Sequence, residues 1–167
     1  CDGSTVPHVG LDVEDLQRCA PESVRLPGME LTEALSWASG RHNAVLITIR
    51  RDGRPQSSDI SYAVGDGMIR ISVTDDRAKT RNLERDPRAI VHITSPDTWS
   101  YLSFDGTVEL SPVAAEPGDA TCQELAQLLR DVQGKEHPDW DEFHQAMVDD
   151  RRRVVRFTPA SVTGQLN

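Results

Sequence analysis

A polar segment over residues 74–83 contains side chains that could bind an anion. It reads Thr-Asp-Asp-Arg-Ala-Lys-Thr-Arg-Asn-Leu and contains the end of a predicted strand and the start of a predicted short helix. The N-terminus of a helix presents free backbone N–H groups to anions, and Arg77 and Lys79 flank that N-terminus. Thr80 adds a hydroxyl, and Asn82 adds an amide that can donate as well as accept hydrogen bonds. The segment therefore predicts a site for a phosphate or carboxylate group.

The charge of the chain is unevenly distributed. Residues 50–88 contain nine Lys and Arg against seven Asp and Glu, a balance of +2, and the other 128 residues carry a balance of −11. A cationic island on an acidic chain favours a compact anionic ligand, because such groups need paired donors rather than a broad positive field. A charge cluster alone is more often a solvated helix face. The interpretation therefore depends on the polar segment over residues 74–83.

The composition argues against several other functions. A chain with 27 acidic and 18 basic residues is unsuited to sequence-independent binding of nucleic acid or of an anionic membrane. No apolar run approaches the ~18 residues of a membrane-spanning helix, and no signal peptide is visible. The cysteines are odd in number and widely spaced, which favours reduced thiols in a cytoplasmic protein and leaves a Cys1–Cys19 bridge open.

One cluster could be interpreted as a metal site. His137, Asp139, Asp141 and His144 bring imidazole and carboxylate groups close together in the sequence. The same residues are explained by a helix that begins after Asp139, with Asp139 as its N-cap and Glu142 three residues later. We therefore expect no metal ion.

The elements that must position these residues form an antiparallel α+β pattern. Strands are predicted over residues 44–50, 56–64, 68–74, 89–94, 99–110 and 154–157. Helices are predicted over residues 29–39, 77–85 and 120–132 and from residue 139 onward. A turn over residues 51–54 predicts a hairpin, and Gly106 predicts a bulge or bend. Short turns between strands, with helices gathered at the ends, favour a barrel.

The chain is predicted to contain one domain. Residues 1–27 lack apolar periodicity and are expected to be an N-terminal extension or linker. Residues 28–167 are expected to form a single domain.

Several segments together resemble a known family. The run Arg-Ala-Lys-Thr-Arg-Asn-Leu at residues 77–83, followed by Asp-Pro-Arg-Ala at 86–89, resembles a cofactor-phosphate motif. That motif belongs to the flavin and deazaflavin oxidoreductases related to pyridoxamine 5′-phosphate oxidase. Companion segments at residues 52–56, 99–101 and 105–107 occur in the same order as in that family. The resemblance covers residues 29–167 and is strongest to the actinobacterial branch that uses coenzyme F420.

The resemblance implies a fold, an assembly and a set of cofactor contacts. The fold would be an antiparallel split β-barrel with flanking helices, in a homodimer that binds its cofactor at the subunit interface. The cofactor phosphate or acidic tail would be held by Arg77, Lys79 and Asn82, with Thr80 beside them. The cofactor ring and ribityl region would be reached by Gln56, Ser58 and Thr74. Trp99 and Tyr101 of the neighbouring subunit would form the wall of the site beside the cofactor ring.

The resemblance also implies an enzymatic function. The protein would transfer a hydride between reduced F420 and an unsaturated or quinone-like organic acceptor. Two alternatives remain open: an FMN-binding oxidoreductase of the same fold, and a carrier that binds F420 or flavin without turnover. No side chain is predicted to act as a catalytic acid or base. Arg85, at the far end of the helix predicted over 77–85, is expected to contribute little to cofactor binding.

Overall fold

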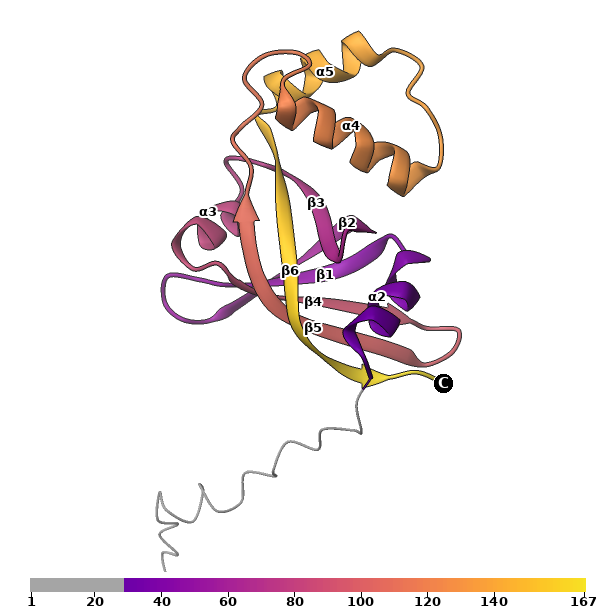
Figure 1. Cartoon of the computed structure of the whole chain (residues 1–167). Helices are drawn as coiled ribbons and strands as arrows, with labels where there is room; N and C mark the ends of the chain where they lie inside the picture. Colours follow the sequence, from indigo (N-terminus) through magenta and orange to yellow (C-terminus); the bar gives the residue numbers. More distant parts are fainter. Residues whose placement is uncertain (1–28) are drawn as a thin grey trace, which may run out of the picture.

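Six antiparallel strands close into a barrel in the order β1-β2-β3-β6-β5-β4 (Figure 1). The computed structural model describes residues 29–167, so the predicted extension over residues 1–27, with Cys1 and Cys19, lies outside the described residues. The strands are β1 (Asn43–Ile49), β2 (Pro55–Gly65), β3 (Met68–Thr74), β4 (Arg88–Ser95), β5 (Ser100–Leu110) and β6 (Arg152–Gln165). The α+β barrel predicted from the sequence is confirmed.

The core of the barrel follows from the alternation of side chains along each strand. In β3 every second residue is buried, so Ile69, Ile71 and Val73 point inward. Phe104 of β5 and Phe157 of β6 are fully buried and fill the interior with them. Burying a side chain of this size contributes about 1.5–3 kcal/mol. The barrel is therefore a packed core, and ligand-binding groups must lie at its rim.

A turn and a bulge predicted from the sequence are both present. Gly53 closes the β1–β2 hairpin with a φ of +81°, and the Arg50 N–H donates to the Arg54 carbonyl at 2.9 Å. Gly106 lies at a β-bulge, where the pairing of β5 with β6 shifts its register. A Cβ at Gly106 would collide with the Thr158 carbonyl oxygen, so the close approach of the two strands requires glycine.

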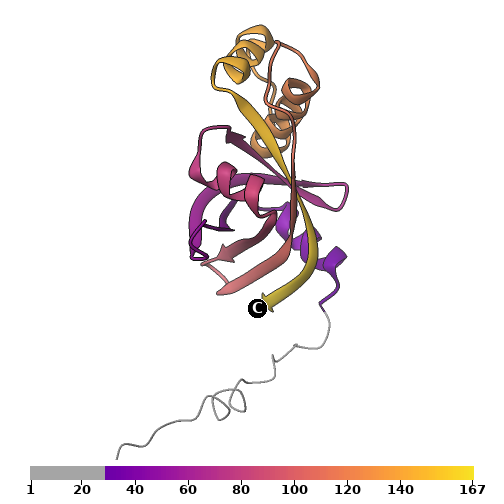
Figure 2. The ribbon, with the colours of Figure 1, turned by 90° about the vertical axis from the view of Figure 1, so that its left-hand side faces the viewer.

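The last strand is longer than the sequence predicts. We expected a strand over residues 154–157, whereas β6 runs from Arg152 to Gln165 and pairs with both β3 and β5. Figure 2 shows β6 running along the whole barrel. Pro159 and Gly164 obscure this strand in the sequence, because both residues are uncommon in strand interiors. Pro159 is accommodated because it lies opposite the bulge at Gly106.

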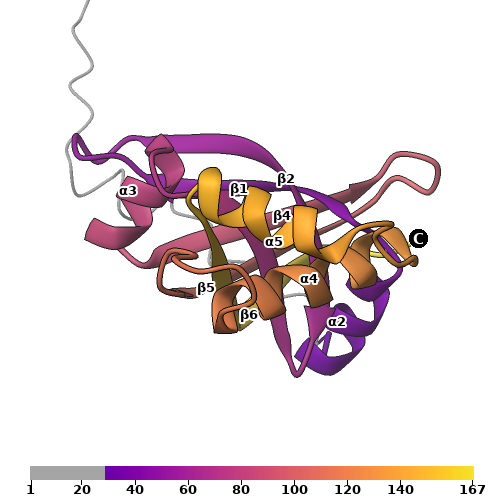
Figure 3. The same cartoon turned by 90° about the horizontal axis from the view of Figure 1, so that it is seen from above.

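Four helices flank the barrel in the part of the chain that the structure describes. They are α2 (Leu31–Ser39), α3 (Ala78–Arg85), α4 (Ala120–Gln133) and α5 (Trp140–Asp149). Helices α4 and α5 lie side by side beyond one end of the barrel, and α3 lies beside the barrel (Figures 1 and 3). Gly134 ends α4 in the left-handed conformation, whereas Gly40 follows α2 with a φ of −81°.

Within the described range, no helix has both the length and the apolarity needed to cross a membrane.

An ion-pair network attaches α4 to the barrel. Glu124 of α4 accepts from Arg156 of β6 at 2.6 Å and lies 3.4 Å from Arg70 of β3. Leu125 of α4 and Phe143 of α5 form a small apolar cluster with the start of β6. These contacts fix the two helices beside the strand ends that carry the candidate site.

Candidate functional site

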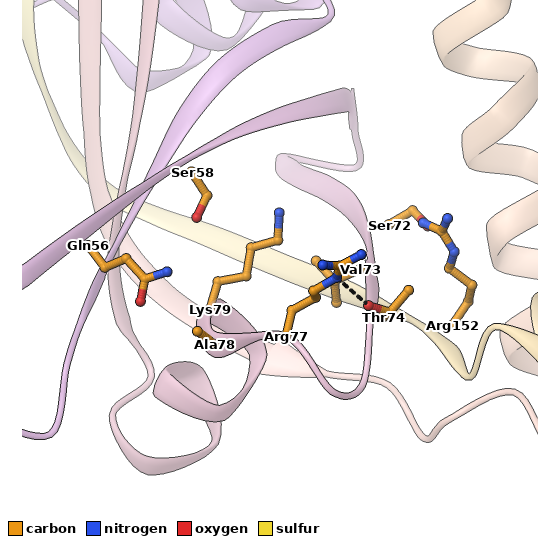
Figure 4. A pocket seen from close by; sticks show the side chains of 9 residues that line it. All are labelled: Gln56, Ser58, Ser72, Val73, Thr74, Arg77, Ala78, Lys79 and Arg152. Carbon is orange, nitrogen blue, oxygen red and sulfur yellow. Dashed lines mark hydrogen bonds between the residues drawn. The ribbon is translucent and has the colours of Figure 1, made fainter.

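A pocket of about 500 Å³ opens between β2, the end of β3, the start of α3 and the start of β6 (Figure 4). Its lining consists of Gln56, Ser58, Ser72, Val73, Thr74, Arg77, Ala78, Lys79 and Arg152. Five of the nine predicted site residues therefore line one pocket: Gln56, Ser58, Thr74, Arg77 and Lys79. We call it the cationic pocket, because it contains three basic side chains and no acidic one.

The start of α3 is held against the end of β3. Arg77 is the N-cap residue, and its side chain makes no capping hydrogen bond. Thr80 is fully buried, and its hydroxyl donates to the Thr74 carbonyl at 2.8 Å. The Thr80 hydroxyl therefore faces the protein and joins the helix to the strand. This contact places Arg77, Ala78 and Lys79 at the rim of the pocket.

The cations of the pocket are not neutralised within it. In the described residues, neither Arg77 nor Lys79 has a carboxylate within 4.0 Å, and Arg152 pairs with Asp150, which does not line the pocket, at 3.3 Å. Burial is the main cause that lowers the pKa of Lys79, and the charges of Arg77 and Arg152 lower it further. Asp59 acts weakly in the opposite direction. An anion in the pocket would relieve this repulsion.

Asn82 lies behind the pocket rather than on its surface. Its side-chain nitrogen donates to Thr48 Oγ1 and to Gln56 Oε1, both at 3.0 Å. Its oxygen accepts from Arg85 Nη2 at 3.0 Å. A second pocket of about 510 Å³, lined by Arg50, Arg51, Asp52, Gln56, Ala78 and Asn82, adjoins the cationic pocket and shares Gln56 and Ala78 with it. The amide of Asn82 is thus already used by protein partners.

Trp99 and Tyr101 do not line the cationic pocket of their own chain. The sequence predicted Trp99 at the start of a strand, but it lies in the β4–β5 turn with a φ of +55°, and β5 begins at Ser100. Trp99 is 85% exposed and Tyr101 is 43% exposed. The β4–β5 turn lies on the opposite side of the barrel from α3 (Figures 1 and 3). Within one chain, these two side chains therefore do not contribute to the cationic pocket.

Two polar lining residues, Ser72 and Arg152, were missed by the sequence analysis. Arg152 begins β6 and pairs with Thr74 of β3, which brings its side chain to the rim. Ser72 lies two residues before Thr74 on the same face of β3. The run of three arginines at 151–153 was the available signal for Arg152, but the pairing with β3 cannot be inferred from local sequence.

The alternative metal cluster contains a helix cap. The Asp139 side chain accepts from the Glu142 N–H at 3.0 Å and thereby caps α5, as predicted. His137 Nδ1 lies 2.6 Å from the Asp139 carbonyl oxygen, within the same turn. These contacts account for Asp139 and His137 as parts of the start of α5.

Comparisons with known proteins identify the family. The sequence model described as pyridoxamine 5′-phosphate oxidase matches residues 31–166. A conserved hypothetical protein from Mycobacterium tuberculosis is similar in structure, with a TM-score of 0.65, 24% identity and coverage of 82% of this chain and 84% of that chain. A structure titled F420 reductase has a TM-score of 0.56 and 24% identity, with coverage of 73% of this chain and 89% of that chain.

A third structure extends the range of ligands in these comparisons. A heme binding protein from Mycobacterium smegmatis has a TM-score of 0.61 and 21% identity, with coverage of 83% of this chain and 54% of that chain. At these identities the solved structures support the fold. The match of the sequence model to residues 31–166 goes further, because it includes nearly all of the described residues. The chain belongs to the pyridoxamine 5′-phosphate oxidase family of split β-barrel proteins.

Proposed function

We propose that this protein is an F420-dependent oxidoreductase. It would bind the cofactor in the cationic pocket and transfer a hydride between reduced F420 and an unsaturated or quinone-like organic acceptor. The observation that carries the proposal is the group of Arg77, Lys79 and Arg152 around one pocket without a lining carboxylate. The structural similarity to a protein titled F420 reductase adds support.

The side chains of the pocket fit the acidic part of such a cofactor. Phosphate and carboxylate groups are bound best by charge-assisted hydrogen bonds from Arg and Lys. The hydroxyl groups of Ser58 and Ser72 lie beside the cations and can donate to further oxygens, whereas the Thr74 hydroxyl already donates to Asp76 at 2.9 Å. Because burial already lowers the pKa of Lys79, a bound anion would stabilise its charged form.

The residues of this chain would bind and orient the cofactor. When bound, the deazaflavin supplies the carbon that gives or receives the hydride. Arg77, Lys79 and Arg152 would neutralise its acidic groups, and Gln56 and Ser58 of β2 would contact the rest of the molecule. The lining contains no imidazole or carboxylate that could act as a general acid or base. The proposal therefore assigns no proton-transfer step to a side chain.

A second copy of the chain would complete the site. Trp99 and Tyr101 are the exposed large hydrophobic side chains in the described part of the molecule. In a homodimer they could cover the cofactor ring bound by the neighbouring subunit. This arrangement reconciles their distance from the pocket of their own chain with their role as ring contacts.

FMN is the second candidate cofactor, because three cations around one compact pocket would also suit its single phosphate. Titrating the purified protein with F420 and with FMN, by fluorescence, separates the two. We expect tighter binding of F420. Tighter binding of FMN, or no binding of F420, would contradict the proposal.

A single-turnover experiment separates an enzyme from a carrier. Reduced F420 bound to the protein is mixed with a quinone, and the return of the oxidised cofactor is followed by its absorbance. We expect the protein to accelerate oxidation over that of free reduced F420. A rate equal to the uncatalysed one, with several quinones and enones, would instead favour the non-catalytic carrier.

A further inference from the structure

A chain of hydrogen bonds runs from the C-terminal end of α3 to the edge of the cationic pocket. Arg85 Nη2 donates to Asn82 Oδ1 at 3.0 Å and to the Ile49 carbonyl at 2.7 Å. Asn82 Nδ2 then donates to Gln56 Oε1 at 3.0 Å. Gln56 lines both the cationic pocket and the pocket that adjoins it. The three side chains therefore connect the C-terminal end of α3 to the ligand-binding surface.

The direction of this chain is fixed by its first member. A guanidinium group can only donate hydrogen bonds, so the Asn82 oxygen must face Arg85 and the Asn82 nitrogen must face away. The second hydrogen of that nitrogen is accepted by Thr48 Oγ1, which is fully buried. If the Asn82 amide were reversed, its NH2 group would face the guanidinium of Arg85, and both groups are donors. Asn82 is only 7% exposed, and an unpaired buried donor costs about 1–3 kcal/mol.

The same logic extends to Gln56. The side-chain oxygen of Gln56 accepts a hydrogen bond from Asn82, so the side-chain nitrogen of Gln56 is the group that faces the pocket. Figure 4 shows this nitrogen turned toward the side of the pocket where Lys79 lies. The pocket therefore presents the two N–H donors of Gln56 in addition to its cations.

We propose that Arg85 and Asn82 are positioning residues that hold the Gln56 amide with its donors toward the pocket. The pocket is thereby set to bind a phosphate, carboxylate or carbonyl oxygen at this point and to reject a ligand that offers a donor there. The inference rests on the proposed function only for the identity of that ligand as F420. It gives Asn82 an indirect role in binding through Gln56.

The proposal is tested on the full chain labelled with ¹⁵N, with inorganic phosphate as the probe. In the ligand-free protein the side-chain N–H groups of Asn82 should exchange slowly with water, because both are donated within a buried site. The side-chain N–H signals of Gln56 should exchange quickly and shift when phosphate is added. Fast exchange at Asn82, or Gln56 signals that phosphate leaves unmoved, would overturn the proposal.

The Asn82→Asp variant separates positioning from packing. It keeps the size of the side chain and its contact with Arg85, but its carboxylate can only accept, so Gln56 must turn its oxygen to the pocket. We expect phosphate affinity to fall about tenfold, the loss of one charge-assisted hydrogen bond. In the Gln56→Ala background, the Asn82→Asp substitution should reduce phosphate affinity less than about threefold, because only the effect of the added negative charge remains. Equal losses in both backgrounds would overturn the proposal.

Variants of Arg85 provide a rescue test. Arg85→Met removes the donor that orients Asn82 and should weaken phosphate binding several-fold, whereas Arg85→Lys keeps a donor-only side chain and should restore most of it. Arg81→Ala, an exposed position on α3, is the control and should bind as the wild type does. Similar losses for Arg85→Met and Arg85→Lys would contradict an orienting role. Failure of F420 to bind a protein that passes these tests would refute the proposed function and leave this inference standing.

Discussion

At the scale of single residues, the protonation of Lys79 sets one of the three positive charges of the pocket. Burial and neighbouring cations lower its pKa in the folded, ligand-free protein. The unfolded chain therefore binds this proton more tightly, and the contribution of Lys79 to stability improves as the pH rises between the lowered pKa and the usual value of 10.5. A bound anion requires the charged form, so its affinity should change in the opposite direction.

We predict that affinity for F420 falls as the pH rises through that window. Fluorescence titrations from about pH 7 upward measure the effect, and the Lys79→Arg variant is the control because Arg keeps its charge throughout. The F420 affinity of the Lys79→Arg variant should change less with pH than that of the wild type. Profiles that fall equally in both proteins would assign the titration to another group.

At the scale of the elements, Arg153 joins three segments around the site. It donates to Asp75 after β3 at 3.0 Å, to Glu84 of α3 at 2.9 Å and to the Ser111 carbonyl after β5 at 2.7 Å. Its side chain is only 12% exposed. Hydrogen bonds to charged groups contribute about 1.5–3 kcal/mol each. Removing the guanidinium would take this donor from Glu84 and the Ser111 carbonyl, whereas Asp75 would keep its contact with Arg151 at 2.7 Å.

We predict that Arg153→Met lowers the free energy of unfolding by about 2–4 kcal/mol. Urea denaturation measures the loss. Arg54→Met provides the comparison, because Arg54 pairs with Asp52 at an exposed turn and such pairs contribute ~0–1 kcal/mol. Equal effects of the two substitutions would show that Arg153 does not hold the segments together.

The bulge at Gly106 is a second property of the strands that can be tested. A Cβ at this position would meet the Thr158 carbonyl oxygen and the ring of Phe157. Gly106→Ala should therefore lower the free energy of unfolding by about 3 kcal/mol or more, as expected for steric strain in a packed region. Gly40→Ala is the control, because a Cβ there meets nothing within 4 Å. A Gly106→Ala protein as stable as the wild type would mean that β5 and β6 can separate at little cost.

Local sequence was sufficient to predict the elements whose pattern is regular. The strand predicted over 68–74 matches β3, because Ile69, Ile71 and Val73 alternate without interruption. The strand β6 was underestimated, since Pro159 and Gly164 are tolerated only through contacts with β5 that the sequence does not reveal.

The same distinction applies to the candidate site. Arg77 and Lys79 come from one continuous segment, so their proximity could be predicted. Arg152 joins them only through its pairing with Thr74, which depends on the register of two strands far apart in the sequence. Arg85 was expected to have little effect, yet its position one turn after Asn82 brings it into contact with that amide.

At the scale of the whole molecule, the exposed aromatic side chains predict self-association. Trp99 is held outward in a conformation that is rare for a bulky residue, and Asn167 Nδ2 donates to its carbonyl at 3.2 Å. Sedimentation velocity at micromolar concentration should show a dimer, and Trp99→Ala should weaken it. If the wild-type protein remained monomeric, Trp99 and Tyr101 of a second copy could not form part of the proposed site.

The most direct test of the central claim is the affinity of the Lys79→Ala variant for F420. A charge-assisted contact contributes about 1.5–3 kcal/mol, and about 1.4 kcal/mol corresponds to a tenfold change in affinity. We predict that fluorescence titration shows at least about tenfold weaker binding than in the wild type, with an almost unchanged melting temperature in the absence of cofactor. Arg81→Ala, on the exposed face of α3, should bind F420 as tightly as the wild type. Equal affinity of the wild type and Lys79→Ala would mean that the cationic pocket is a solvated surface and not the cofactor site.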